Sequence, residues 1–106
     1  MKNRIERNVK EQVKTRCKVA GAFYVMPVSM GLGARGTPDF LICHRGRFLA
    51  VETKAPGGKP TPHQTLALAR CRQAGGVAMV VDGTDFSMLD EFLAVVGERI
   101  GKVLGQ

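Results

Sequence analysis

Two strand-like runs joined by a short polar turn constrain the fold of this chain more than any other feature. Residues 39–43 (DFLIC) and 48–54 (FLAVETK) combine apolar, aromatic and β-branched side chains, and only the turn His44-Arg45-Gly46-Arg47 separates them. A turn with an even number of residues, centred on Arg45-Gly46, makes the two runs an antiparallel hairpin in which the numbers of facing residues add up to 91. The other elements therefore have to pack around this hairpin.

Periodic segments and loop-forming residues surround the hairpin. We expect, in chain order, a helix over 3–20, a strand over 23–28, a Gly-rich loop over 29–37, a Gly/Pro loop over 55–60, a helix from Pro62 to Gly75-Gly76, a strand over 77–81 and a helix over 85–103. The strands at 48–54 and 77–81 flank a helix, so they should be parallel neighbours. The order α-β-β-β-α-β-α predicts one α/β domain over residues 1–106, with a mixed central sheet flanked by helices.

The charge of the chain is unevenly distributed. Sixteen basic and nine acidic residues give a net charge of +7. Residues 1–20 and 21–81 each carry seven basic and two acidic residues, whereas 82–106 carry two and five. A basic body is typical of proteins that bind polyanions such as nucleic acids. Because many basic proteins bind no nucleic acid, charge alone leaves the partner open.

Several classes of protein are disfavoured by the sequence. No apolar run reaches the ~20 residues that a membrane span needs, and the charged N-terminus does not read as a signal peptide. The three cysteines, Cys17, Cys43 and Cys71, are widely spaced and form no zinc-ligand pattern. We therefore expect no membrane partner, no disulfide framework and a reducing cytoplasm.

The hairpin register brings two acidic residues together. Asp39 would face Glu52, and Lys54 would point to the same side as Glu52. Opposed carboxylates repel each other unless a cation compensates, and Mg²⁺ prefers one or two carboxylates together with substrate phosphates. Asp39, Glu52 and Lys54 are thus candidates for a site of metal-assisted phosphoryl transfer. The alternative is a solvated surface cluster in which Lys54 neutralises one of the acids.

Two further polar residues are ambiguous. Helical periodicity turns Glu6 toward the body of the protein, where it could join the two acids, pair with Arg16 or lie at the edge of the apolar stripe. Gln64 could close a capping box with Thr61, and it also shares the face of its helix that packs on the sheet. We expect Glu11, on the opposite side of its helix, to be solvated.

The segment Gly31 to Gly36 matches the GxGxxG pattern but lacks its structural context. A strand follows it, whereas a dinucleotide-binding loop precedes a helix. We interpret it as a loop that lets a phosphate backbone approach, with Arg35 as a phosphate contact. His44 and His63 are expected at the surface. The complete set of candidate DNA-binding residues is Arg35, Lys59, Arg45, Arg47 and Lys10.

Three motifs in this order resemble a known nuclease superfamily. Gly36-Thr37-Pro38-Asp39, then Glu52-Thr53-Lys54, then Gln64 on the next helix resemble the PD-(D/E)XK nucleases, and the stretch ETKAPGGKPTPHQ is similar to their VRR-NUC (virus-type replication-repair nuclease) branch. The resemblance implies a restriction-endonuclease-like core and metal-dependent hydrolysis of DNA phosphodiester bonds.

The resemblance also implies the roles of individual residues. Asp39, Glu52 and the backbone carbonyl of Thr53 would bind Mg²⁺ or Mn²⁺, and Lys54 would position the attacking water. Glu6 and Gln64 match the accessory acid and glutamine of the family.

The family resemblance extends to the substrate and the assembly. Stand-alone members of this size resemble Holliday-junction resolvases, which are homodimeric endonucleases, and this implies a four-way junction as the DNA partner. The final helix is the candidate dimer interface, because its acidic flank is poorly suited to face DNA. The resemblance to the virus-type branch also fits a bacterial cell or a virus-infected host cell. Two other functions stay open from the residues: a non-catalytic basic nucleic-acid-binding module, and a metal-dependent phosphoesterase acting on RNA or nucleotides.

Overall fold

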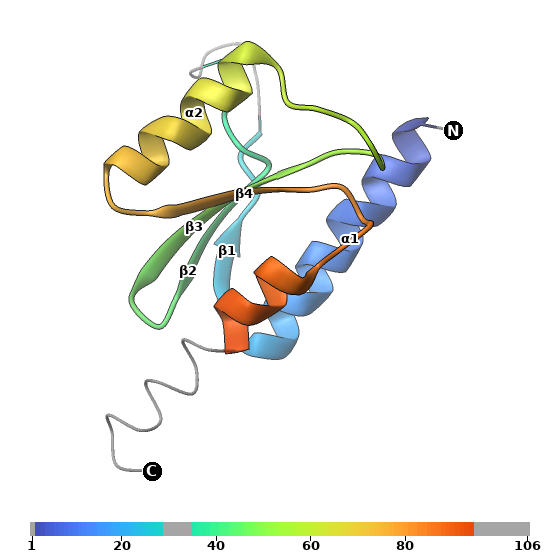
Figure 1. The fold of residues 1–106 in the computed structure, drawn as a ribbon. Helices are drawn as coiled ribbons and strands as arrows, with labels where there is room; N and C mark the ends of the chain where they lie inside the picture. The colour runs from blue at the N-terminus through green and yellow to red at the C-terminus, as the bar shows by residue number, and fades with distance from the viewer. Residues whose placement is uncertain (1, 29–34, 95–106) are drawn as a thin grey trace, which may run out of the picture.

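A four-stranded mixed sheet lies at the centre of the computed structural model, which describes residues 2–28 and 35–94 (Figure 1). The elements are α1 (Lys2–Ala20), β1 (Phe23–Val25), β2 (Phe40–His44), β3 (Arg47–Thr53), α2 (Pro62–Gln73), β4 (Val77–Val81) and a last helix that begins at residue 87 and is described to residue 94. The strand order is β1-β2-β3-β4, with β3 and β4 parallel and the other pairs antiparallel. The predicted α/β class, element order and parallel pair are confirmed, and residues 95–103 of the expected last helix lie outside the described residues.

The hairpin has the predicted register. His44 faces Arg47 and Phe40 faces Val51, so the facing numbers add up to 91 throughout. Arg45 and Gly46 both have positive φ, 54° and 83°, as a two-residue hairpin turn of type I′ requires. The turn therefore fixes which residues end up beside one another at the far end of the hairpin.

The first strand is shorter than the expected 23–28. Its pairing with β2 ends at Val25, which faces Leu41. If the same register continued, Pro27 would face Asp39 and residue 28 would face Pro38. Because neither proline has an N–H to donate, the ladder cannot be extended there.

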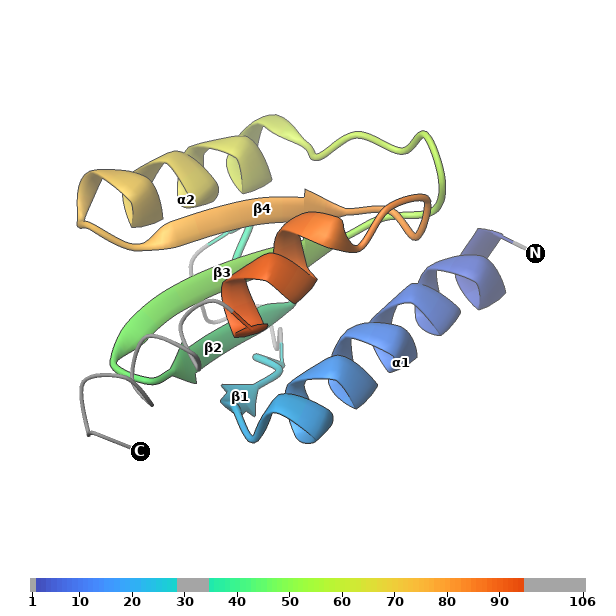
Figure 2. The ribbon, with the colours of Figure 1, turned by 60° about the horizontal axis from the view of Figure 1, so that its bottom comes forward.

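The two faces of the sheet are covered by different helices. Figures 1 and 2 show α1 and the helix over 87–94 on one face and α2 on the other. The first face buries the larger core, made of Val9, Val13, Cys17, Phe40, Ile42, Leu49, Val51, Met79, Val81, Leu89, Phe92 and Leu93. Under α2 the buried core is small, with Ala50, Leu68 and Ala78. Burial raises the pKa of the Cys17 thiol to about 11, so this cysteine is a core side chain and not a reactive one.

Gly36 ties the segment before β2 to the first turn of α2. It has a φ of +77°, and a Cβ placed on it would overlap the backbone carbonyl of His63 and the backbone nitrogen of Gln64. Only glycine allows this close approach. The contact holds Asp39, three residues later, near the start of α2.

The expectation that His44 lies at the surface is wrong. It is 3% exposed, and its Nε2 lies 2.9 Å from the Leu93 carbonyl oxygen. His44 follows Phe40 and Ile42 at a spacing of two residues, so it points to the face that the last helix covers. His63 is exposed as expected. Among the described helices, none combines the length and apolar character needed to cross a membrane.

Candidate active site

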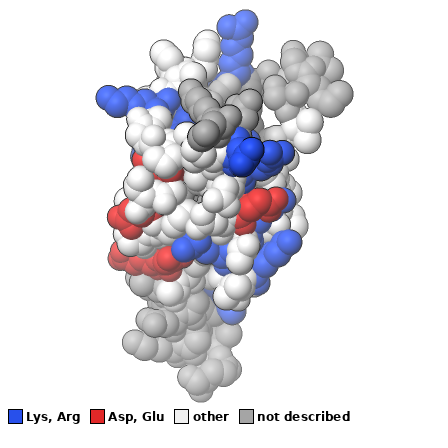
Figure 3. Space-filling model, turned by 90° about the vertical axis from the view of Figure 1, so that its right-hand side faces the viewer, with Lys and Arg blue, Asp and Glu red and all other residues white. Residues whose placement is uncertain are grey.

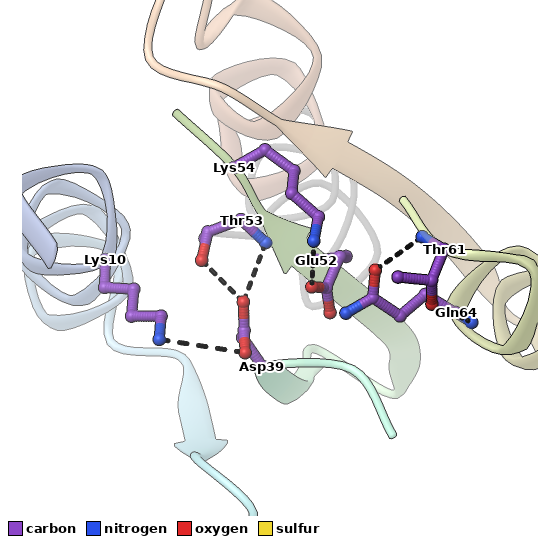
Figure 4. Close-up of polar contacts among 7 residues, drawn as sticks. All are labelled: Lys10, Asp39, Glu52, Thr53, Lys54, Thr61 and Gln64. Atoms are coloured by element: carbon purple, nitrogen blue, oxygen red, sulfur yellow. Dashed lines mark hydrogen bonds and ion pairs between the residues drawn. The ribbon is translucent and has the colours of Figure 1, made fainter. Parts of the chain in front are cut away.

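Asp39 and Glu52 come together at the open end of the hairpin (Figure 4). Asp39 directly precedes β2, and Glu52 is the second-last residue of β3. Oδ2 of Asp39 accepts hydrogen bonds from the backbone N–H of Thr53 at 3.0 Å and from its hydroxyl at 2.6 Å. These two bonds fix the carboxylate of Asp39 through one oxygen and leave the other, Oδ1, for a different partner.

Glu52 is buried without full compensation of its charge. The residue is 3% exposed, and its Oε1 has no hydrogen-bond partner among the described residues. Burial, and next the charge of Asp39, raise the pKa of Glu52 to about 7, although Lys54 opposes the shift. A buried carboxylate of this kind is destabilising, so the site as it stands favours any cation that can bind Oε1.

Two lysines flank the pair of acids from different elements. The Nζ of Lys54 lies 3.6 Å from Oε2 of Glu52, and the Nζ of Lys10, on α1, lies 3.9 Å from Oδ1 of Asp39. The sequence predicts a DNA contact for Lys10, and Figure 4 shows its side chain directed at Asp39. Four formal charges therefore alternate across the site, each acid beside one ammonium group.

Gln64 forms the predicted capping box and also lies beside the two acids. Its Oε1 accepts a hydrogen bond from the backbone N–H of Thr61 at 2.8 Å, and the Thr61 hydroxyl accepts one from the Gln64 N–H at 3.2 Å. This is the predicted capping box. Figure 4 shows the remaining group, the side-chain nitrogen of Gln64, on the side of Glu52. The cap thus holds the amide in an orientation that presents a donor to the site.

Glu6 lies at the edge of the site and not inside it. It is partly buried and lines a cavity of about 390 Å³ with Arg7, Lys10, Glu11, Lys14 and Met26. Within the described residues it makes no hydrogen bond or ion pair to Asp39 or Glu52. The alternative of an ion pair with Arg16 is wrong, because Arg16 instead contacts Asp90 at 2.9 Å. Glu11 is exposed, as expected, and pairs with Lys14 at 3.2 Å.

The other four candidate DNA-binding residues fall into two groups. Arg35 and Lys59 are exposed, and each lies within two residues of Gly36 or Thr61, at the start of α2 beside the site. Arg45 and Arg47 lie at the turn of the hairpin, five or six residues along the strands from the acids, which is roughly 17–20 Å at the rise of a strand. Figure 3 shows Lys and Arg side chains spread over the side on which α1 lies, interspersed with acidic ones.

The residues present fit a hard divalent cation. Oδ1 of Asp39 and Oε1 of Glu52 are carboxylate oxygens without a hydrogen bond among the described residues, and the carbonyl of Thr53 is the third expected ligand. No cluster of three or more His, Cys, Asp or Glu side chains forms in the described ranges 2–28 and 35–94. Two carboxylates with a carbonyl leave the remaining positions to water and phosphate oxygens, which suits Mg²⁺ or Mn²⁺ and disfavours a closed zinc site.

Sequence reasoning misses two features of this site. The side chain of Thr53 holds Asp39, whereas the sequence motif points only to its carbonyl. Asp39 precedes the strand, so the register does not define the direction of its side chain. The contact of Lys10 with Asp39 depends on how α1 packs across the sheet, and no signal along the chain reports that packing.

Comparison with known proteins identifies the family. No protein-family model matches the chain. "Putative nuclease p44" of Acyrthosiphon pisum secondary endosymbiont phage 1 is 36% identical to this chain over 86 residues, which cover 80% of this chain and 86% of the phage protein. A solved structure described as a VRR_NUC domain has a TM-score of 0.66 and 30% identity, covering 83% of this chain and 92% of that one. The chain therefore belongs to the VRR-NUC nuclease family.

Proposed function

We propose that this protein is an Mg²⁺- or Mn²⁺-dependent endonuclease that hydrolyses phosphodiester bonds of DNA. The observation that carries the proposal is the buried Glu52, whose Oε1 lacks a partner among the described residues and whose carboxylate lies beside that of Asp39. A protein that only binds nucleic acid gains nothing from placing two acids where a polyanion would approach.

The positions of the residues support a role for each of them. Asp39, Glu52 and the carbonyl of Thr53 would hold the cation. When bound there, it would polarise the scissile phosphate and make a water molecule a better nucleophile. Thr53 keeps Asp39 in place through two hydrogen bonds.

Lys54 and Gln64 supply hydrogen-bond donors on the other side. The ammonium group of Lys54 lies beside the buried Glu52, where it can donate to the attacking water or to a phosphate oxygen that gains negative charge. The amide nitrogen of Gln64 can orient the same water or phosphate. Both donors are held in place before substrate arrives, which favours catalysis.

Two observations support DNA as the proposed substrate: the positive charge of the chain and its similarity to a phage nuclease. The chain carries a net charge of +7, and Arg35 and Lys59 lie exposed beside the site. The phage relative is named a nuclease. RNA and nucleotides share the phosphodiester or phosphate chemistry, so they serve as comparison substrates in the test.

We also propose a homodimer that cuts four-way junctions. A junction with two-fold symmetry presents two equivalent phosphates, which suits a protein with two equivalent sites. The helix over 87–94 exposes Asp90 and Glu91, and an acidic surface is better turned toward a second copy of the protein than toward DNA. Light scattering at micromolar concentration should give twice the 11.5 kDa mass of one chain; a monomer with and without junction DNA would contradict this part.

The test of the activity is cleavage of matched labelled substrates: a four-way junction, a linear duplex, single-stranded DNA and an RNA duplex. We expect cleavage in Mg²⁺ or Mn²⁺, none in chelator, and loss of activity in Asp39→Asn, Glu52→Gln and Lys54→Ala. Glu11→Gln is the matched control, because it removes an exposed carboxylate whose partner among the described residues, Lys14, lies on the same helix. A wild-type protein that binds DNA but cuts no substrate with either metal would replace this proposal with the binding-module function.

A further inference from the structure

Lys10 occupies an unusual position for a surface lysine. Its neighbour Val9 is 3% exposed and Val13 is fully buried, so the packing of α1 on the sheet fixes where Lys10 emerges. Its side chain is 36% exposed, and it reaches from α1 toward the segment before β2. The contact joins a helix near the N-terminus to the candidate metal site.

The oxygen that Lys10 approaches is the one that a metal would need. Oδ2 of Asp39 already accepts two hydrogen bonds from Thr53, so Oδ1 is the free ligand, and the Nζ of Lys10 lies 3.9 Å from it. An ammonium group and a divalent cation in front of the same carboxylate oxygen repel each other. Binding of the cation therefore favours movement of Lys10 away from Asp39.

Lys10 is better suited to move than Lys54. The side chain of Lys54 is 17% exposed, and that of Lys10 is 36% exposed and lies at a longer ion-pair distance. Lys10 also lines the cavity of about 390 Å³ along α1, whose charged lining consists of three basic residues and two acidic ones: Arg7, Lys10, Lys14, Glu6 and Glu11. A released Lys10 ammonium would enter this cavity beside Arg7, where a phosphate group is a suitable partner.

We propose that Lys10 is a counter-ion of Asp39 in the metal-free protein, which the metal displaces and which then binds a DNA phosphate. The proposal rests on the proposed function of the site. Lys10 is a positioning residue in this scheme: it lowers the affinity for the metal when DNA is absent and strengthens DNA binding when the metal is present. Coupling between two ligands is reciprocal. The factor by which bound metal raises the affinity for DNA should therefore equal the factor by which bound DNA raises the affinity for the metal.

The first test measures metal binding without DNA. Isothermal titration with Mg²⁺ compares wild type, Lys10→Met and Lys18→Met; methionine keeps much of the apolar stem, and Lys18 is an exposed α1 lysine two turns from Lys10 with no described contact to the acids. We expect Lys10→Met to bind Mg²⁺ roughly three- to tenfold more tightly than wild type. Lys18→Met should stay within about twofold, which controls for the loss of one positive charge. Equal or weaker binding by Lys10→Met would overturn the inference.

The second test measures DNA binding in a Lys54→Ala background, which we expect not to cleave. Mg²⁺ should raise the affinity for a labelled duplex in Lys54→Ala, and the added Lys10→Met substitution should remove most of that increase while leaving affinity in chelator nearly unchanged. If Mg²⁺ raises the DNA affinity equally in Lys54→Ala and in the double variant with Lys10→Met, the inference that the displaced Lys10 binds a phosphate is contradicted. If wild type takes up neither Mg²⁺ nor Mn²⁺ in the first test, the proposed function fails and this inference fails with it. If wild type binds the metal but Lys10→Met binds it no more tightly, this inference fails and the proposed function stands.

Discussion

The two ends of the β2–β3 hairpin each bury a titratable side chain, and the two groups have opposite surroundings. Glu52 at the open end and His44 at the turn end are both 3% exposed. The Nε2 of His44 has a partner, the carbonyl oxygen of Leu93 at 2.9 Å, and its ring packs near Phe92. Oε1 of Glu52 has no partner within the described chain.

This difference separates a buried group with a hydrogen bond from one that is a candidate functional residue. A buried polar group with a hydrogen bond contributes to stability, whereas one without a partner is destabilising and persists only if something else, such as a ligand, compensates. The turn end also has the larger cavity, about 610 Å³, which apolar atoms from Val19, Ala20 and Leu93 help to line. Neither burial nor cavity size therefore distinguishes the two ends; the unpartnered oxygen of Glu52 is what makes the open end the candidate site.

The largest expected effect is a split between activity and stability at Glu52. Glu52→Gln keeps the shape and removes the charge, so cleavage in Mg²⁺ should fall by roughly a thousandfold. The melting temperature in chelator at pH 7.5 should be equal to or higher than that of wild type, because an uncompensated buried charge has been removed. Cleavage assays and thermal melts followed by circular dichroism check the two halves. A variant that cuts within tenfold of wild type would remove Glu52 from the site.

The pH dependence of the stability of the metal-free protein tests the uncompensated burial of Glu52 in a second way. Burial raises the pKa of Glu52 from 4.5 to about 7, so between these values the folded protein retains a proton that the unfolded chain releases. The contribution of this group to stability is therefore lost as pH rises from about 4.5 to 7, by at most about 3 kcal/mol. Denaturant unfolding in chelator across this range measures the slope in wild type, and Glu52→Gln, which cannot titrate there, is the control. Equal slopes in the two proteins would contradict the expectation.

At the turn end we expect a loss of stability without a loss of activity. His44→Ala removes the hydrogen bond to Leu93 and leaves a cavity beside Phe92, so it should cost about 1–3 kcal/mol of unfolding free energy. The activity per folded molecule should stay within about twofold. His63→Ala is the matched control, since His63 is exposed and should change stability by less than about 0.5 kcal/mol. Loss of activity in fully folded His44→Ala would break the distinction between the two ends.

Much of the fold and part of the candidate site follow from local sequence. The two-residue turn at Arg45-Gly46 sets the register over the whole hairpin, because the pairing of antiparallel strands propagates from the turn. This register, and the position of the acids relative to it, follows from the residues of the hairpin alone. The capping box of Thr61 and Gln64 is equally evident along the chain, because both partners lie within one helical turn.

The remaining features depend on contacts between residues distant in sequence. The contact of Lys10 with Asp39 joins α1 to the start of β2, the burial of His44 comes from a helix 49 residues further along, and the unpartnered state of Glu52 depends on how the surrounding elements exclude water. None of these is a property of spacing along the chain. The order of the elements, the hairpin register and the identity of the acids follow from the residues along the chain. Which buried polar group has a hydrogen-bond partner depends on the folded protein, because partners and burial are supplied by side chains and backbone that folding brings together.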